Sequence, residues 1–417
     1  MEYPELSKLF HMDTSSDRYS KNETEAARRR EMDSTFIIEM LSDSEDLFIV
    51  MPREMVVLME KILRAERKTS AMMRAIPPIG QAALIRGLVL DEVVSTNTIE
   101  GIHSTRRQIE EALESREIND TSFKRFKELA LLYLRLAEKD QPSAPGTLEE
   151  IREIYDAIME GELEESDKPD GELFRKSGVD ITANGVKTIH HGIEPESRIF
   201  EGLNNMLKLT ARNDMPELIS SLASHYLFEC IHPFYDGNGR TGRYLLALYL
   251  DESLSIPTVL SLSCTIAENK NAYYAAFSSV ENPLNHGEMT HFVYSMLELI
   301  RTAQSSMIER LQSNIEHFET VQQNCMEYFE QNSLSKKERE IVFVLAQYDL
   351  FGMVSSLTWN SIADSIELGK QTTRNHLKKL ENKGIVQAVS KKPLKFKLTQ
   401  EAEEAVSYTH LRDHETS

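Results

Sequence analysis

The sequence has little cysteine, and its three cysteines (Cys230, Cys264 and Cys325) lie far apart. Disulfide-stabilised secreted domains carry more cysteines at closer spacing, so a disulfide framework is not expected. No run of about 18 apolar residues occurs, so no transmembrane helix is expected. The first residues also lack the apolar stretch after a basic start that typifies a secretion signal. These absences favour a cytoplasmic location with a reducing environment.

Basic residues are also fewer than acidic residues. The chain has 67 acidic and 47 basic residues, a formal net charge of −20. This charge disfavours nonspecific nucleic-acid binding by the molecule as a whole, although a local basic module is not excluded. Hydrophobic residues make up 41% of the 417 residues, enough for real cores in two or three domains.

Apolar residues recur at helical spacing over most of the chain, which predicts a mainly α fold. Residues 1–33 are polar with few aromatics and are expected to be a mobile lead-in. Beyond two helical runs between residues 51 and 100, helices are expected at 107–118, 122–138, 148–163, 216–231, 240–252 and 287–330.

One segment has the pattern of strands. Residues 179–189 form two short alternating runs around Asn184-Gly185, and this dipeptide between such runs is a strong hairpin signal. A β-hairpin is therefore expected inside a helical domain. His190 and His191 follow it without a third ligand at metal spacing nearby, so neither is expected to bind a metal.

The C-terminal part predicts a winged helix: helices at 335–348, 358–366 and 370–384, then two short strands. Basic residues gather in the last of these helices and in the strands: Lys370, Arg374, Lys378, Lys379, Lys383, Lys391, Lys392, Lys395 and Lys397. DNA binding and a protein contact both fit this pattern. The final residues, SYTHLRDHETS, fit no element and are interpreted as a non-native extension.

The densest chemistry lies in His232-Pro-Phe-Tyr-Asp-Gly-Asn-Gly-Arg-Thr-Gly-Arg243, between two expected helices. Gly237 and Gly239 permit a tight turn and a close ligand. The N–H groups that open the following helix would converge on one spot, where the helix dipole adds partial positive charge. This arrangement predicts a phosphate site.

The polar residues of this motif fit nucleotide chemistry. Arg240 and Arg243 share a helix face and suit phosphate oxygens, and Asn238 can donate to one. Asp236 supplies a carboxylate for Mg²⁺, and His232 can accept a proton near neutral pH. Each residue alone has an ordinary structural explanation, but their density in one loop indicates a functional site.

This motif resembles the signature of the Fic (filamentation induced by cAMP) family, H-x-F-x-[DE]-G-N-G-R-x-x-R, at every fixed position. The resemblance extends over roughly residues 35–300, and the chain is similar to bacterial Fic proteins that end in a winged helix. It implies a mainly α Fic fold with a β-hairpin flap. It also implies a protein adenylyltransferase, which moves AMP from ATP to a Ser, Thr or Tyr hydroxyl of a target protein.

The resemblance implies a role for each matching position. His232 would be the general base, and Asp236 would hold Mg²⁺ against the phosphates. Nucleotide binding would fall to Gly237, Asn238, Gly239, Arg240, Thr241, Gly242 and Arg243. Tyr273 is expected in the adenine pocket, with core packing as the alternative. Lys187, Thr188 and Ile189 of the flap would pair with the target's backbone. His225 and Cys230 are expected in the core.

A second segment, Thr96-Asn-Thr-Ile-Glu100-Gly101, resembles the inhibitory motif of Fic proteins, [ST]-x-x-x-E-[GN]. The resemblance implies that Glu100 pairs with Arg243 and restrains the enzyme. ATP would then bind with a misaligned α-phosphorus. Reverse hydrolysis of the AMP–protein bond stays open.

These predictions divide the chain into six parts: a lead-in (1–33), an N-terminal helical segment (34–120), a catalytic domain (121–285), a helical connector (286–333), a winged helix (334–405) and a tail (406–417). The alternatives to adenylyl transfer are transfer of another nucleotide such as UMP, and a nucleotide-sensing DNA-binding regulator. ATP and Mg²⁺ are the expected cofactors. The expected partner is a hydroxyl-bearing protein, and a second copy of this chain as that target, a homodimer and DNA stay open.

Overall fold

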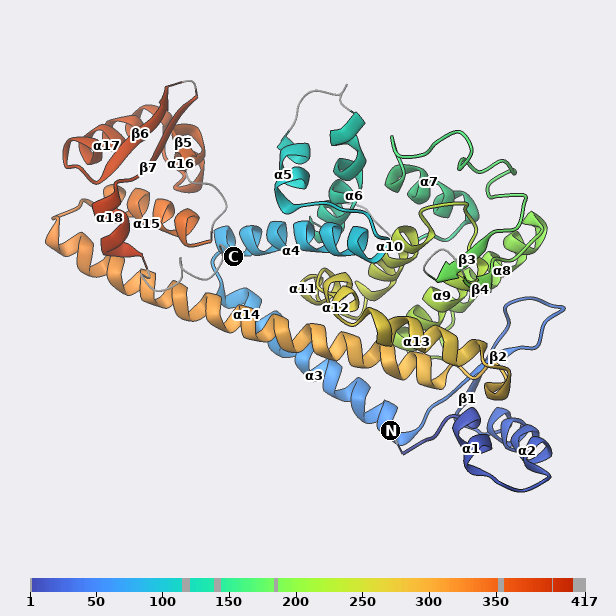
Figure 1. Ribbon diagram of the computed structural model, residues 1–417. Coiled ribbons are helices and arrows are strands. Elements are labelled where there is room, and N and C mark those ends of the chain that lie inside the picture. The colour runs from blue at the N-terminus through green and yellow to red at the C-terminus, as the bar shows by residue number, and fades with distance from the viewer. Residues whose placement is uncertain are drawn as a thin grey trace. The chain divides into compact units, whose positions relative to one another are not determined.

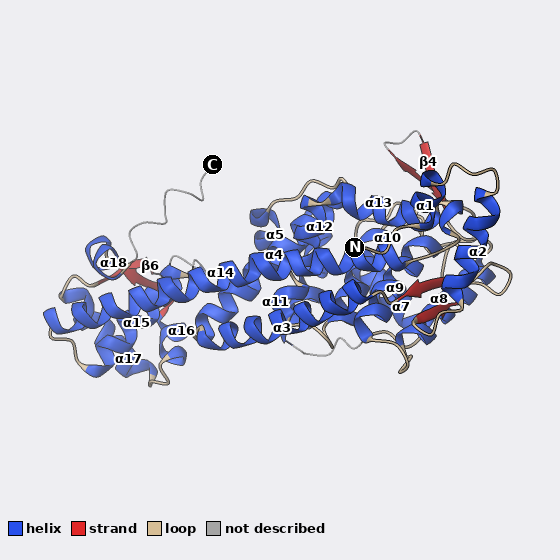
Figure 2. Ribbon diagram, turned by 90° about the horizontal axis from the view of Figure 1, so that it is seen from below, coloured by secondary structure: helices blue, strands red, loops and turns tan. Residues whose placement is uncertain are grey.

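The protein is mainly α-helical, as predicted (Figures 1 and 2). The computed structural model describes residues 2–114, 121–138, 144–183, 187–351, 356–391 and 393–407. Within these ranges, no helix is long and apolar enough to span a bilayer.

The helices of the first 290 residues include the two that flank the motif. They are α1 (Leu6–Met12), α2 (Arg18–Arg30), α3 (Arg53–Ala75), α4 (Pro78–Ile99), α5 (Arg106–Glu114), α6 (Thr121–Glu138), α7 (Leu148–Ile158), α8 (Glu196–Thr210), α9 (Glu217–Ile231), α10 (Asn238–Leu250), α11 (Ile256–Val259), α12 (Leu262–Glu268), α13 (Lys270–Glu281) and the 3-10 turn η1 (Pro283–Asn285). The later helices are α14 (Thr290–Gln331), α15 (Lys336–Leu350), α16 (Trp359–Ser365), α17 (Lys370–Asn382) and α18 (Gln400–Val406).

The described strands form three small sheets. β1 (Thr35–Ile38) pairs antiparallel with β2 (Leu47–Val50). β3 (Asp180–Ala183) pairs antiparallel with β4 (Lys187–His191), so the predicted hairpin is present. Its Asn184-Gly185 turn lies outside the described residues. The third sheet has the order β5-β7-β6, from β5 (Leu357–Thr358), β6 (Val386–Lys391) and β7 (Leu394–Leu398).

Helices α9 and α10 form the centre of the motif-bearing region. They pack against each other, and α8 packs against α9. Almost every residue of α9 and α10 is buried, which agrees with apolar side chains on all sides of α9. The motif is therefore the connection between two buried helices, and its backbone cannot shift without disturbing the core.

The N-terminal segment differs from the expectation of a mobile lead-in. Residues 6–30 contain α1 and α2, and Leu6 and Phe10 are buried. Arg29 of α2 forms a buried ion pair with Glu288, at 2.9 Å between Nη1 and Oε2. The polar composition predicted disorder because it could not show a partner almost 260 positions away in the sequence.

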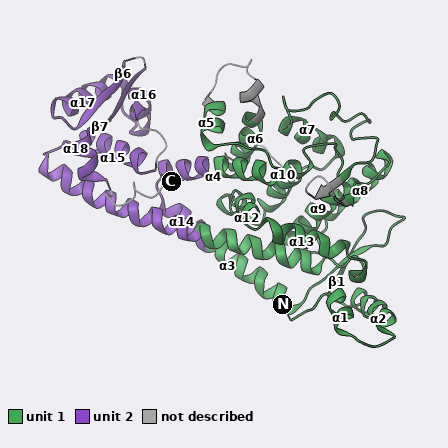
Figure 3. Ribbon diagram, viewed as in Figure 1, with its two compact units in different colours: residues 1–67, 88–307 green, residues 68–87, 308–417 purple. Residues whose placement is uncertain are grey.

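The chain divides into two compact units, coloured separately in Figure 3. The first comprises residues 1–67 and 88–307, and the second comprises residues 68–87 and 308–417. The second unit therefore includes the end of α3 and the start of α4, which the domain boundaries expected from the sequence did not group with the C-terminal part. Gly80 illustrates the close packing inside this unit, because a Cβ there would collide with the ring of Phe351.

The second unit has the element order predicted for a winged helix. Helices α15, α16 and α17 precede the strands β6 and β7, and β5 adds a third strand. Its core includes Ile341, Ile362, Leu377 and Phe396. Helix α18 follows β7 and was not predicted, while residues 408–417 of the expected tail lie outside the described part.

Candidate active site

The turn that ends α9 fixes the position of His232. This residue adopts the left-handed conformation (φ 52°, ψ 61°), and its backbone N–H donates to the carbonyl oxygen of Phe228. Its Nδ1 lies 3.2 Å from the carbonyl oxygen of Glu229. With the proton on Nδ1 to make that hydrogen bond, Nε2 is the proton acceptor. Burial lowers the pKa of the His232 imidazole to about 4, so it is a neutral base at pH 7.

Arg175 stabilises this turn, a role that the sequence did not predict. Its buried guanidinium donates to the carbonyl oxygens of Ser177, Ile193, Ile231 and His232, at 2.6 to 3.3 Å. A cation here satisfies carbonyls at the C-terminal end of α9, which would otherwise lack partners. Nothing in the spacing of Arg175 distinguishes it from a surface arginine, because the four carbonyls meet only in the folded chain.

The loop between the two helices is braced by one aromatic and one amide. The Phe234 ring is fully buried and stacks on Tyr155, with ring centroids 3.5 Å apart. The Asn238 amide accepts from the Phe234 N–H (3.0 Å) and donates to the Phe234 carbonyl (2.8 Å). The resemblance implied a phosphate contact for Asn238, whereas in this structure its side chain is buried and fixes the loop.

Helix α10 begins where the loop requires glycine. Gly237 has φ 80°, and a Cβ there would collide with the sulfur of Met159. The first N–H groups of α10 belong to Asn238, Gly239 and Arg240 and have no intrahelical carbonyl to pair with. Their position at the start of the helix fits the phosphate site that the sequence predicts.

Asp236 presents a carboxylate beside this helix start. Its side chain is 64% exposed, its Oδ1 accepts from the Gly237 N–H, and its Oδ2 lies 4.0 Å from Arg240. An exposed carboxylate next to a phosphate site suits Mg²⁺, which takes one or two carboxylates together with phosphate oxygens and water. Asp236 fits the predicted role of metal ligand.

The two arginines of the motif have different surroundings. Arg240 is 1% exposed, pairs with Glu162 at 2.6 Å, and donates to the sulfur of Met159. Its pairing with Glu162 was not predicted. Glu162 lies in the segment that follows α7, and this contact orients the guanidinium of Arg240.

Arg243 makes the contact that the sequence predicted. Its Nη2 lies 2.6 Å from Oε1 of Glu100, and it also donates to the hydroxyl and the carbonyl oxygen of Thr96. Burial alone would lower the pKa of Arg243, but the Glu100 carboxylate raises it above its usual range. Burial would likewise raise the pKa of Glu100, but the charge of Arg243 holds it below its usual range. Both groups are charged, and they neutralise each other.

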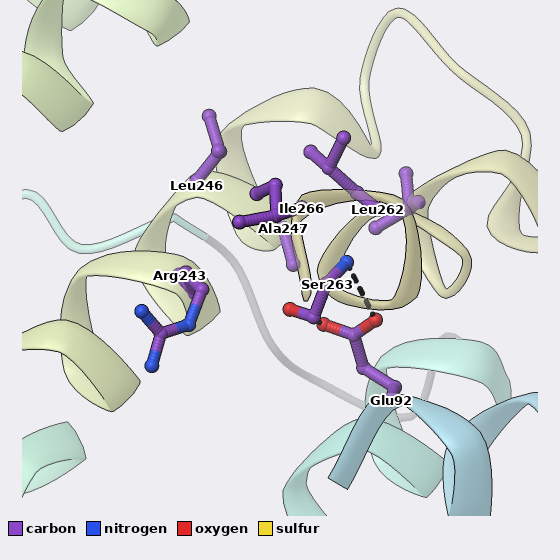
Figure 4. A pocket seen from close by; sticks show the side chains of 8 residues that line it. Glu92, Arg243, Leu246, Ala247, Leu262, Ser263 and Ile266 are labelled. Atoms are coloured by element: carbon purple, nitrogen blue, oxygen red, sulfur yellow. Dashed lines mark hydrogen bonds between the residues drawn. The ribbon is translucent and has the colours of Figure 1, made fainter. Parts of the chain in front are cut away.

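Two further carboxyl groups lie around Arg243 and were not singled out in the sequence. Glu92 of α4 lines a small pocket with Arg243 (Figure 4), and it accepts hydrogen bonds from the N–H and hydroxyl of Ser263. Glu229 of α9 faces Gly242, where a Cβ would collide with its Oε1. Burial raises the pKa of each carboxyl to about 7. No spacing rule reveals this cluster, because its members come from separate helices.

Tyr273 is a buried residue of α13. It is 2% exposed, and its hydroxyl contacts Nε2 of His225 at 2.8 Å. These surroundings fit core packing, the alternative to a place in the adenine pocket, because a buried tyrosine needs a hydrogen-bond partner and His225 supplies it. The predictions that His225 and Cys230 are buried are confirmed.

The hairpin is tethered to the helices at the end of β4. His190 contacts Oε1 of Glu281 through Nδ1 and the carbonyl oxygen of Cys230 through Nε2, both at 2.7 Å. The side chains of Lys187, Thr188 and Ile189 lie outside the described part, although their backbone forms β4.

The expectation that His190 has no third ligand nearby is wrong. Ligand atoms of His190, Cys230 and Glu281 lie within 4.8 Å of one another. Both ring nitrogens of His190 already have hydrogen-bond partners, and burial raises the pKa of the Cys230 thiol. The group is therefore a hydrogen-bonded anchor in this structure.

Known proteins resemble this chain in sequence and in fold. Residues 145–250 match the Fic/DOC family, a narrower range than the predicted resemblance. A solved Fic family protein from Desulfovibrio desulfuricans G20 has 17% identity and a TM-score of 0.52, covering 84% of this chain and 97% of that chain. Fic-1 (residues 134–508) from C. elegans is less similar, with 16% identity and a TM-score of 0.44 over 62% of this chain and 74% of that one. The chain thus contains a Fic/DOC family domain, in a fold shared with the Desulfovibrio protein.

Proposed function

We propose that this protein transfers AMP from ATP to a hydroxyl side chain of a target protein. The observation that carries the proposal is the convergence at one turn of a neutral, half-buried imidazole (His232), an exposed carboxylate (Asp236) and the open N–H groups of α10. These are a base, a metal ligand and a phosphate cradle, the groups needed for nucleotidyl transfer.

The chain's residues divide the chemical work. The N–H groups at the start of α10 bind phosphate oxygens, and Arg240 and Arg243 balance their charge. His232 Nε2 takes the proton of the target hydroxyl, whose oxygen bonds to the α-phosphorus. The bond between the α-phosphorus and the bridging oxygen breaks, and pyrophosphate leaves. Asp236 would hold Mg²⁺, which neutralises phosphate charge when bound.

The restraint belongs to the same proposal. Glu100 pairs with the guanidinium of Arg243, and Thr96 accepts two further hydrogen bonds from that guanidinium. A phosphate oxygen and a carboxylate cannot both pair with the same Nη2 without repelling each other. Glu100 therefore slows transfer by keeping Arg243 from the phosphates.

The test is incubation of purified protein with α-³²P-ATP, Mg²⁺ and a bacterial lysate. Labelled protein should rise at least tenfold in Glu100→Gly and disappear in Glu100→Gly/His232→Ala. Glu100→Gln is the matched control for size, because it keeps the side chain and removes the charge, and it should activate partly. No labelling in any sample, with ATP still bound, would sink adenylyl transfer. Labelled UTP, GTP and CTP would then test the other nucleotides.

The target is proposed to dock on the hairpin. Strand β4 pairs only with β3 among the described residues, so its other edge can receive an extended segment of the target. A hydroxyl in that segment would lie near His232, because His190 ties the end of β4 to the last turn of α9. A second copy of this chain can supply such a segment.

DNA binding is a second candidate, favoured by the exposed face of α17. Lys370, Arg374, Lys378 and Lys379 are exposed there, on a molecule of net charge −20. Fluorescence anisotropy with duplex DNA at 50 to 200 mM salt tests it, since phosphate contacts weaken steeply with salt. Binding that Lys378→Glu/Lys379→Glu does not reduce would argue against this face.

A further inference from the structure

Arg243 lies among three carboxyl groups, and only two have described hydrogen-bond partners. Glu100 pairs with Arg243 itself, and Glu92 accepts from Ser263. Oε1 of Glu229 is buried and makes no hydrogen bond within the described residues. A buried carboxyl oxygen without a partner is costly, and it points to a ligand or a proton that completes the site.

The position of Glu229 links the base to the phosphate site. It lies in the last turn of α9, three residues before His232, and its carbonyl oxygen contacts the His232 imidazole. Its side chain extends to the first turns of α10, where a Cβ on Gly242 would be 3.1 Å from the Glu229 carboxyl carbon and would collide with Oε1. The glycine at 242 makes room for this carboxyl group.

The charges around Glu229 come from several elements. Arg243 of α10 favours its ionised form, and Glu100 at the end of α4 opposes it. Tyr273 of α13 and Cys230 of α9 also face it, both in the neutral state because burial raises each pKa. Arg243 therefore stabilises the charges of both Glu229 and Glu100, and it is already paired with Glu100 at 2.6 Å.

We propose that Glu229 is the proton acceptor that couples nucleotide binding to pH: when a triphosphate reaches Arg243, Glu229 takes up a proton from solvent and becomes neutral. This inference rests on the proposed nucleotide site. The added phosphate charge disfavours the ionised carboxylate, and the neutral form turns the buried oxygen into an O–H donor that can face a phosphate oxygen. In the free protein burial already raises the pKa of Glu229 to about 7, so the carboxyl is mostly ionised at pH 8, and a pKa well above 8 in the bound state makes it mostly neutral there.

The test is calorimetric titration of the full chain carrying Glu100→Gly, in which the phosphates can reach Arg243, with α,β-methylene-ATP and Mg²⁺ in two buffers of different ionisation enthalpy. At pH 8 this reference protein should take up close to one proton for each nucleotide bound. Between pH 7.5 and 8.5 its Kd should weaken by up to roughly tenfold, the limit for one linked proton. In Glu100→Gly/Glu229→Gln, which mimics the neutral acid, the uptake should vanish and the Kd should stay constant.

Glu92→Gln is the matched control, because Glu92 also faces Arg243 with a similarly raised pKa. It should keep the uptake if Glu229 is the acceptor. Uptake that survives Glu229→Gln in this background, or a Glu100→Gly protein without uptake, overturns this inference while leaving adenylyl transfer intact. A Glu100→Gly protein without uptake overturns it even if the Glu229 variant fails to fold. Absence of nucleotide binding at every pH would instead overturn the proposed function and this inference together.

Discussion

His232 has a strained, left-handed backbone conformation and a neutral imidazole that can act as a base. The left-handed conformation places the imidazole at the end of α9, and burial keeps it neutral. A base must be unprotonated to act, so the depressed pKa widens the pH range in which His232 works.

The prediction at this residue concerns the acid limb of the pH profile. The pKa of His232 is lowered to about 4, so its neutral form is lost only as the pH falls through that value. Labelling by Glu100→Gly should keep most of its rate at pH 5, where a histidine of pKa 6.5 would be only about 3% neutral. The measurement is kcat/KM from pH 4.5 to 7. A midpoint near 6.5 would show that the imidazole is not desolvated in solution.

Arg175 leads to a prediction about stability. Arg175→Met removes donors from four carbonyl oxygens, two of them at the end of α9. The expected loss in the free energy of unfolding is about 3 kcal/mol, together with loss of activity because the His232 turn is no longer held. Chemical denaturation measures the first effect. Arg198→Met is the control, because its pair with Asp43 is exposed and its loss should cost less than about 1 kcal/mol. Equal losses in the two variants would contradict this account.

At the scale of elements, the β3–β4 hairpin depends on one histidine. Both His190 nitrogens are hydrogen-bonded to acceptors, a carbonyl and a carboxylate, so the ring bridges them fully only as imidazolium. Burial would lower the pKa of His190, but Glu281 and the Cys230 carbonyl raise it overall. A raised folded pKa means that the stabilisation is complete below the unfolded value and is lost as the pH rises through the folded value.

The hairpin should therefore open more often at higher pH. Hydrogen exchange of residues 180–183 and 187–191, corrected for intrinsic rates, should accelerate several-fold from pH 6 to pH 9 in the wild type. In His190→Gln exchange should be fast at both values. Exposed His191, on the same strand, is the matched control, and His191→Gln should behave as the wild type. If the protection of the hairpin from hydrogen exchange changed neither with pH nor in His190→Gln, His190 would not anchor the hairpin.

At the scale of the whole molecule, the second unit includes helix ends from outside the predicted winged helix. The core of that unit takes Val321, Cys325 and Phe329 from the end of α14, and Ile79 packs against it from the start of α4. Deleting residues 334–417 should expose these apolar side chains. The shortened protein is expected to bind a hydrophobic dye and to self-associate in size-exclusion chromatography, whereas deleting residues 408–417 should do neither. A monomeric, dye-free product of the larger deletion would mean that these residues need no cover.

The sequence by itself determined the local features of this protein. The helical periodicity, the hairpin and the His232–Arg243 motif depend on residues close together in the chain, and backbone sterics and capping act at that range. The contact between Glu100 and Arg243 was also predictable, but only because both motifs resemble a known family.

Only the tertiary structure decided which distant groups meet. Arg175 beneath His232, Glu162 behind Arg240, and Glu92 and Glu229 around Arg243 come from elements whose spacing carries no common signal. The same reason explains why residues 1–33 differ from expectation. Burial of a polar or charged group depends on a partner elsewhere in the fold, and the chain order does not encode that partner locally.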